Sequence, residues 1–158
     1  MGMLVEGQWH SDTTGLVDDD GALQRPESVF RNWITADGAP GPTGDGGFEA
    51  EPGRYHLYVA RACPWAHRAT LFRELKGLQA MVGLSVTHWL MAEDGWTFAT
   101  GPGVIPDPLH DVECLWQLYV RADPVYSGRV TVPVLWDTQR ETIVSNESAD
   151  IIRMFNSA

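Results

Sequence analysis

Apolar residues after about position 54 fall into short segments that alternate between strand composition and helical periodicity. Four segments are predicted to be strands: residues 55–60, 85–90, 130–136 and 141–144. Three are predicted to be helices: a run that opens at residues 63–64 and ends before residue 83, then residues 111–122, then about 147–155. The order is therefore β-α-β-α-β-β-α, and the glycine- and proline-rich residues 94–108 are expected to be irregular.

This order predicts an α/β fold. The opening strand–helix–strand unit favours a parallel pair of strands with a crossover helix, whereas the short turn at residues 137–140 favours an antiparallel hairpin. Together they give a four-stranded mixed sheet covered by helices, which is the thioredoxin-like arrangement. Pro133 interrupts the third strand, and a proline is tolerated there if the backbone turns its polar groups toward a ligand, often through a cis peptide bond. The alternative is an edge-strand proline with no role.

The first 53 residues differ from the rest in charge. They hold ten acidic residues against two basic ones, whereas residues 54–158 hold eleven against nine, so most of the acidity lies in this segment. Turn-forming residues at 18–21 and 38–47 exclude regular structure there. Four aromatic residues are spaced through the segment and favour an extended arm held on the surface of a domain at residues 54–158: Trp9, Phe30, Trp33 and Phe48. A loosely ordered acidic tail is the alternative.

Composition excludes several classes of protein. With 158 residues, of which 44% are hydrophobic, the chain can bury the core of one domain. The net charge of −10 argues against nucleic acid or an anionic membrane as a partner. No apolar run reaches the roughly 18 residues that span a bilayer. The early residues lack the basic character of a signal or transit peptide, so we expect a cytoplasmic protein.

Cys63 is the candidate nucleophile because it lies at the junction of a predicted strand and helix. Unpaired N–H groups and the positive end of a helix dipole favour a thiolate at such a position, and Arg61 and Arg68 add positive potential. Ala66 stands where a Cys-x-x-Cys pair has its second thiol, so an external thiol must resolve any mixed disulfide. An inert buried cysteine is the alternative.

The second cysteine, Cys114, falls within the second predicted helix and is interpreted as a small apolar residue. Two cysteines are too few for a disulfide scaffold or a four-ligand zinc site, and the histidines show no paired metal-ligand spacing. No metal is therefore expected.

The last predicted helix opens with Glu147 and Ser148, and Ser145 and Asn146 precede it as candidate caps. A helix N-terminus suits a carboxylate ligand. Ser148 can donate a hydrogen bond to that carboxylate, while Glu147 can accept one from an ammonium group. An ordinary acidic first turn is the alternative interpretation.

Four segments together resemble the xi-class glutathione transferases, the glutathionyl-hydroquinone reductases: residues 63–68 (CPWAHR), 93–96 (EDGW), 128–137 (GRVTVPVLWD) and 143–156 (IVSNESADIIRMFN). The resemblance covers roughly residues 25–158. It implies a thioredoxin-like first domain that binds glutathione, with glutathionylated hydroquinones as the other partner.

The resemblance also implies a role for each site residue. Cys63 is the nucleophile that faces the glutathione sulfur. Val132, ahead of a cis Pro133, offers its backbone N–H and C=O to the cysteinyl part of glutathione. Glu147 and Ser148 hold the γ-glutamyl end. The site is completed by two further residues, Trp96 and Arg129.

In the family reaction a cysteine thiolate attacks the sulfur of a glutathionyl-hydroquinone, and a second glutathione regenerates the enzyme. Relatives carry a second, all-helical domain that supplies the hydroquinone pocket, and this chain stops at Ala158. We therefore expect impaired reductase activity from the chain alone, and an exposed face that favours a homodimer. The alternatives are a glutaredoxin-like thioltransferase that removes glutathione from mixed disulfides, and a glutathione-binding module without catalysis.

Overall fold

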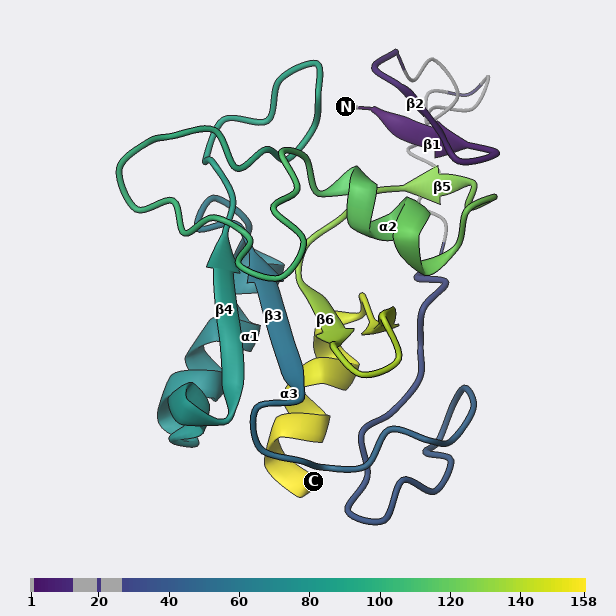
Figure 1. Cartoon of the computed structure of the whole chain (residues 1–158), viewed down its shortest axis with the longest axis vertical. Coiled ribbons are helices and arrows are strands. Elements are labelled where there is room, and N and C mark those ends of the chain that lie inside the picture. The colour runs from purple at the N-terminus through teal and green to yellow at the C-terminus, as the bar shows by residue number, and fades with distance from the viewer. Residues whose placement is uncertain (1, 13–19, 21–26) are drawn as a thin grey trace.

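The computed structural model describes residues 2–12, 20 and 27–158. Its central sheet has the strand order β4-β3-β6-β7. These strands are β3 (Tyr55–Val59), β4 (Val82–Val86), β6 (Val134–Asp137) and β7 (Thr142–Ser145). β3 is parallel to β4 and antiparallel to β6, and β6 is antiparallel to β7. The predicted thioredoxin-like mixed sheet is therefore confirmed (Figure 1).

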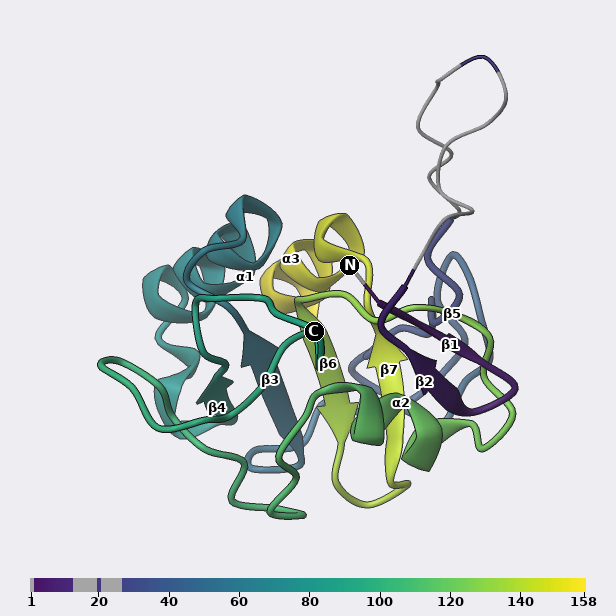
Figure 2. The ribbon, with the colours of Figure 1, turned by 90° about the horizontal axis from the view of Figure 1, so that it is seen from above.

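Helices cover both faces of this sheet. α1 (Pro64–Leu75) and α3 (Ser148–Ser157) pack against each other on one face, whereas α2 (Trp116–Ala122) lies on the other (Figure 2). A short 3-10 helix, η1 (Leu78–Ala80), lies between α1 and β4. Between these layers all five residues of β3 and all four of β6 are buried, which explains their almost continuous apolar sequence.

The third predicted strand, residues 130–136, is too long at its start. The Val132–Pro133 peptide bond is cis, and the strand begins only at Val134. The hydroxyl of Tyr119 accepts a hydrogen bond from the Thr131 N–H and donates one to the Thr131 carbonyl. The Tyr119 side chain thus takes the place of a neighbouring strand for Thr131, which lies ahead of β6.

Two other boundaries also differ from the prediction. β4 covers residues 82–86 rather than 85–90 because it pairs with the five residues of β3, after which Thr87 donates its N–H to the Val59 carbonyl. α2 begins at Trp116 rather than at residue 111. The prediction that Cys114 lies within this helix is wrong, because the side-chain oxygen of Gln117 accepts the Glu113 and Cys114 N–H groups in the preceding turn.

The first ten residues contain strands that the sequence did not indicate. β1 (Met3–Val5) and β2 (Gln8–His10) form a hairpin, and β1 also pairs with β5 (Gly128–Arg129). Gly7 has a positive φ of 75° in the hairpin turn, where a side chain would be strained. The side chain of Leu4 has no exposed surface, so this hairpin is part of the packed structure.

Residues 27–53 run against β7 and α3 with little regular structure. Backbone hydrogen bonds join Asn32 to Val144 and Asn146 to Phe30. Trp33 and Phe48 are buried, and Trp9, from the hairpin, stacks on Trp116 with the ring centroids 6.3 Å apart. All four aromatic residues of the predicted arm therefore contact the body. Most of the acidic run at 18–21 lies outside the described residues, and the boundary at residue 53 stays a prediction.

Arg54 fixes the end of this segment to the sheet. Its Nε lies 3.0 Å from Oδ1 of Asp137, which is fully buried on β6, and its Nη2 donates to the Gly47 carbonyl at 2.8 Å. The hydrogen bond to Asp137 raises the pKa of the Arg54 guanidinium, against the opposing effect of burial. Arg54 and Asp137 are both buried, so replacing either one with a neutral residue would leave the charge of the other buried and unpaired.

Candidate active site

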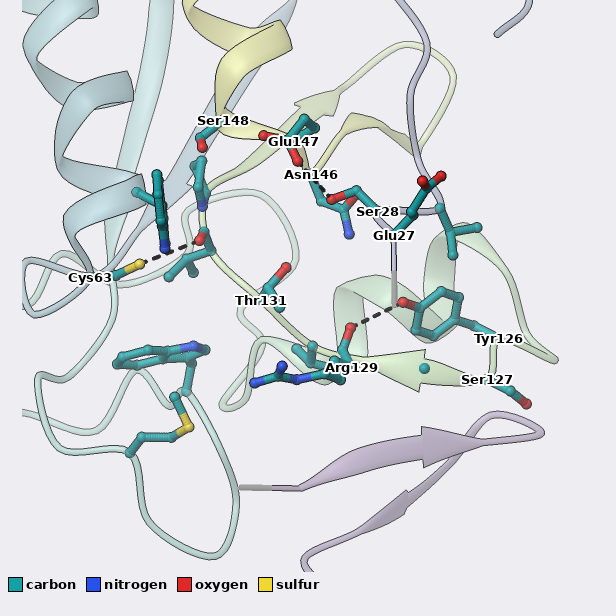
Figure 3. A pocket seen from close by; sticks show the side chains of 18 residues that line it. Glu27, Ser28, Cys63, Tyr126, Ser127, Arg129, Thr131, Asn146, Glu147 and Ser148 are labelled. Atoms are coloured by element: carbon teal, nitrogen blue, oxygen red, sulfur yellow. Dashed lines mark hydrogen bonds between the residues drawn. The ribbon is translucent and has the colours of Figure 1, made fainter. Parts of the chain in front are cut away.

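A cavity of about 350 Å³ lies where the N-termini of α1 and α3 meet the segment that joins β5 to β6 (Figure 3). Residues 27–29 form a further part of its wall. The structure brings all of the sequence-predicted site residues to this one cavity: Cys63, Trp96, Arg129, Val132, Pro133, Glu147 and Ser148. They come from four separate parts of the chain, and the fold alone assembles them.

The Cys63 thiol lies directly before the first turn of α1. Cys63 is the N-cap residue, with extended backbone angles, and its side chain caps no backbone N–H. Sγ lies 3.6 Å from the carbonyl oxygen of Val132 and is directed toward it (Figure 3). The residue is partly exposed and lines the cavity.

Val132 and Pro133 form the wall that faces Cys63. The cis peptide bond between them is the one that the resemblance implies. Val132 is 5% exposed, and its carbonyl oxygen accepts from the Cys63 thiol. Thr131, the preceding residue, is held by two hydrogen bonds with the Tyr119 hydroxyl. The backbone that faces the thiol is therefore fixed by a buried side chain.

Glu147 is the N-cap of α3, in place of the predicted Ser145 and Asn146. Its Oε1 accepts from the Ala149 N–H at 3.0 Å, and its Oε2 accepts from the Ser28 hydroxyl at 3.1 Å. Burial raises the pKa of Glu147, but these two hydrogen bonds and the nearby Arg31 and Arg68 charges lower it below its ordinary value. Glu147 is therefore a carboxylate at neutral pH, able to accept a hydrogen bond from a cationic group.

Ser148 follows at the first position of the helix and is 4% exposed. Its hydroxyl oxygen accepts two hydrogen bonds from Arg68 of α1, from Nε at 3.0 Å and from Nη2 at 2.6 Å. These bonds join the N-terminal halves of α1 and α3. The charge of Arg68, predicted to act near Cys63, is thus directed at the other end of the cavity.

Trp96 and Arg129 also line the cavity, and Arg129 lies on a different side of it from Glu147 and Ser148 (Figure 3). Trp96 is 8% exposed and belongs to the loop between β4 and α2, where its carbonyl accepts the Leu115 N–H at 2.8 Å. Arg129 is on β5, and its carbonyl accepts from the Tyr126 hydroxyl at 3.0 Å (Figure 3). Both backbones are therefore held in place independently of any ligand.

Sequence reasoning missed two residues that support this cavity, and it gave a third residue only a helix-capping role. Ser28 bonds Glu147 from a segment that was interpreted as a surface arm, and Tyr119 and Asn146 support the wall from the core. The Asn146 amide donates to the Tyr119 hydroxyl at 3.2 Å. Only Asn146 had a signal in the sequence, because it adjoins Glu147; Ser28 and Tyr119 are distant along the chain.

Within the described part of the chain, no group of three or more His, Cys, Asp or Glu side chains is placed to hold a metal ion. No helix among the same residues has the length and apolar character to cross a bilayer.

A thiol at the start of α1 faces a cis-proline peptide beside the four-stranded mixed sheet, which is the arrangement of a thioredoxin-like domain. Residues 62–158 match the family model described as glutathione S-transferase, N-terminal domain. The chain belongs to the glutathione S-transferase family.

Two curated relatives match the whole chain. It is 60% identical over 159 residues to the glutathionyl-hydroquinone reductase YqjG of Escherichia coli K12, covering 100% of this chain and 48% of the relative. It is 44% identical over 158 residues to the glutathionyl-hydroquinone reductase PcpF of Sphingobium chlorophenolicum, covering 100% and 47%. The chain thus spans about half the length of the curated relatives it matches.

Solved structures of glutathione transferases also resemble this chain. The glutathione-bound structure of Escherichia coli YqjG superposes with a TM-score of 0.86 at 57% identity, covering 99% of this chain and 46% of that one. A xi-class glutathione transferase from Natrialba magadii superposes with a TM-score of 0.82 at 48% identity, covering 98% and 44%.

Proposed function

We propose that this chain is the glutathione-binding, thiol-bearing part of a glutathionyl-hydroquinone reductase, and that Cys63 takes the glutathionyl group from its substrate. The observation that carries the proposal is the position of the Cys63 sulfur. It lies at the start of α1, 3.6 Å from the Val132 carbonyl oxygen, in one cavity with Glu147 and Ser148. The names of the two curated relatives support the proposal.

Glutathione fits the cavity with its γ-glutamyl end at the N-terminus of α3. The Glu147 carboxylate accepts from the ammonium group, while the helix terminus and the Ser148 hydroxyl stabilise the α-carboxylate. The Val132 backbone offers its N–H and C=O to the cysteinyl part. This orientation brings the glutathione sulfur to Cys63. Trp96 and Arg129 complete the site on its other side.

In the first step, the Cys63 thiolate attacks the sulfur of the glutathionyl-hydroquinone. A sulfur–sulfur bond forms and the sulfur–carbon bond to the ring breaks. The electron pair of that bond goes to the ring carbon, which takes up a proton, and the hydroquinone leaves. The product on the protein is a Cys63–glutathione mixed disulfide.

In the second step, the thiolate of a second glutathione attacks the glutathionyl sulfur of this mixed disulfide. Glutathione disulfide forms and the Cys63 thiolate is released. Ala66 fits this monothiol cycle, because a thiol one turn further along α1 would compete with the incoming glutathione. Cys114 is not among the residues that line the cavity.

Intact-protein mass spectrometry tests the first step. The chain is mixed with a glutathionyl-hydroquinone in the absence of free glutathione. We expect one glutathionyl group per chain, with release of an equal amount of hydroquinone. The variant Cys63→Ala should acquire no adduct and release no hydroquinone, because it lacks the attacking sulfur.

Cys114→Ser is the matched control and should behave like the unmodified chain. An adduct on Cys114, or hydroquinone release by Cys63→Ala, would contradict the proposal. Reaction with a simple glutathione mixed disulfide but not with the hydroquinone conjugate would identify a thioltransferase instead. Glutathione binding without either reaction would identify a binding module.

A further inference from the structure

The guanidinium of Arg68 is held in position by its surroundings. Its Cζ atom lies 5.0 Å from the centroid of the Trp65 ring, and its Nη2 lies 3.7 Å from Oε1 of Glu147. The stacked ring and the carboxylate each stabilise the cation. Arg68 therefore presents two N–H groups to Ser148 before any ligand is bound.

The contact with Arg68 uses most of the hydrogen-bonding capacity of the Ser148 hydroxyl. A serine hydroxyl has two lone pairs and one hydrogen. Arginine has no acceptor, so both Arg68 contacts, at 3.0 and 2.6 Å, use the lone pairs of Oγ. Ser148 donates a hydrogen bond to none of the residues that the structure describes. Its hydrogen is left for a group in the cavity.

We propose that Arg68 makes this end of the cavity specific for a carboxylate, because it leaves Ser148 able only to donate. The inference rests on the proposed function, since the group concerned is the α-carboxylate of the γ-glutamyl residue. A carboxylate offers only acceptors and a negative charge, and it meets a donor polarised by a guanidinium. A neutral or hydrogen-bond-donating group at this position would leave the Ser148 hydrogen unpaired.

Glu147 strengthens this selection from the other side. Both of its oxygens accept hydrogen bonds, from Ala149 and from Ser28, and they retain further lone pairs for an ammonium group. A donor-only hydroxyl beside an acceptor-only carboxylate matches the carboxylate and ammonium of an α-amino acid group. A second hollow at this end is lined by Arg31, Trp65, Arg68, Glu147 and Ser148, together with residues 27–28, so the pair lies at an accessible surface.

Isothermal titration calorimetry with two peptides tests the inference. One peptide is glutathione, and the other is γ-aminobutyryl-cysteinylglycine, which lacks only the α-carboxylate of the γ-glutamyl residue. The unmodified chain should prefer glutathione by at least about tenfold, the usual value of a hydrogen bond to a charged group. In Arg68→Met the preference should fall by at least about threefold, through loss of glutathione affinity alone, because the helix terminus still stabilises the carboxylate.

The variant Arg68→Lys covers the case in which Arg68→Met does not fold. A lysine keeps the charge but presents a single nitrogen, so it should retain an intermediate preference. Arg121→Met is the matched control, because this half-exposed arginine of α2 pairs loosely with Glu141 at 4.0 Å and lies outside the cavity. It should keep the full preference.

The ratio of the affinities for the two peptides shows whether Arg68 determines specificity or only supports the fold. If Arg68→Met weakens both peptides equally and keeps their ratio, Arg68 is only structural and the inference is overturned. If the unmodified chain binds the two peptides equally, the inference is also overturned, while the glutathione site stands. If the unmodified chain binds neither peptide, the proposed function fails and this inference fails with it.

Discussion

Tyr119 shows how a single buried residue can support a site that it does not enter. Its side chain has no exposed surface, and burial raises the pKa of its hydroxyl, which therefore stays protonated. That hydroxyl bonds the Thr131 N–H, the Thr131 carbonyl and the Asn146 amide. Thr131 precedes Val132, and Asn146 precedes Glu147. One oxygen atom thus connects the two backbone segments that are proposed to bind glutathione.

Replacing Tyr119 with phenylalanine removes this oxygen and keeps the ring. We expect Tyr119→Phe to raise the Kd for glutathione about fivefold, which corresponds to roughly 1 kcal/mol. The free energy of unfolding should fall by about 1–3 kcal/mol, because the buried N–H donors of Thr131 and Asn146 lose their acceptor. Calorimetry measures the first effect and urea unfolding the second.

Tyr58→Phe is the matched control for that experiment. Tyr58 is equally buried and its hydroxyl donates to Asp107 at 2.8 Å, outside the cavity. It should show a comparable stability loss with unchanged glutathione affinity. Equal affinity losses in both variants would mean that Tyr119 acts on the fold in general.

At the scale of elements, the sequence indicated the central sheet and the position of Cys63 well. These elements are local, because strand composition, the helical spacing and Pro64 all occur within short windows. The β1–β2 hairpin was missed because its strands have three residues each and no clear alternation. Ser28 could not be found because its partner Glu147 is 119 residues away, and no local pattern encodes that contact.

The hairpin gives a prediction of its own. Leu4 is fully buried on β1, whereas Val5, next to it on the same strand, is 43% exposed. Leu4→Ala should destabilise the folded chain by about 3 kcal/mol, the usual effect of emptying a core position. Urea unfolding measures it, and Val5→Ala should cost less than about 1 kcal/mol. Equal, small effects would show that the hairpin contributes little to folding.

At the scale of the whole molecule, a buried histidine makes stability depend on pH. His56 is 5% exposed on β3, and its Nε2 pairs with Ser85 Oγ at 2.8 Å. Ser85 in turn donates to the Pro106 carbonyl, so its oxygen accepts from the neutral ring. Burial lowers the pKa of His56 to about 4, and its ordinary value is about 6.5.

Because the folded pKa is lower, the unfolded chain binds the proton first as the pH falls. The folded state should therefore lose up to about 3 kcal/mol between pH 6.5 and about 4, with the full contribution present above pH 6.5. Urea unfolding at a series of pH values measures this slope. His56→Gln should flatten it, whereas His67→Gln, on the outer surface of α1, should retain it. A slope that persists in His56→Gln would assign it to other groups.

The pairing of Met3 with Arg129 has a further consequence. Arg129 is proposed to contact glutathione, and it pairs with Met3 where β5 lies beside β1. Because the two strands are hydrogen-bonded to each other, a change in the mobility of β5 also changes the mobility of β1. Amide exchange in the opening residues should slow when glutathione occupies the cavity. Occupancy could therefore be followed from a peptide at one extremity of the polypeptide, remote in sequence from every proposed ligand contact.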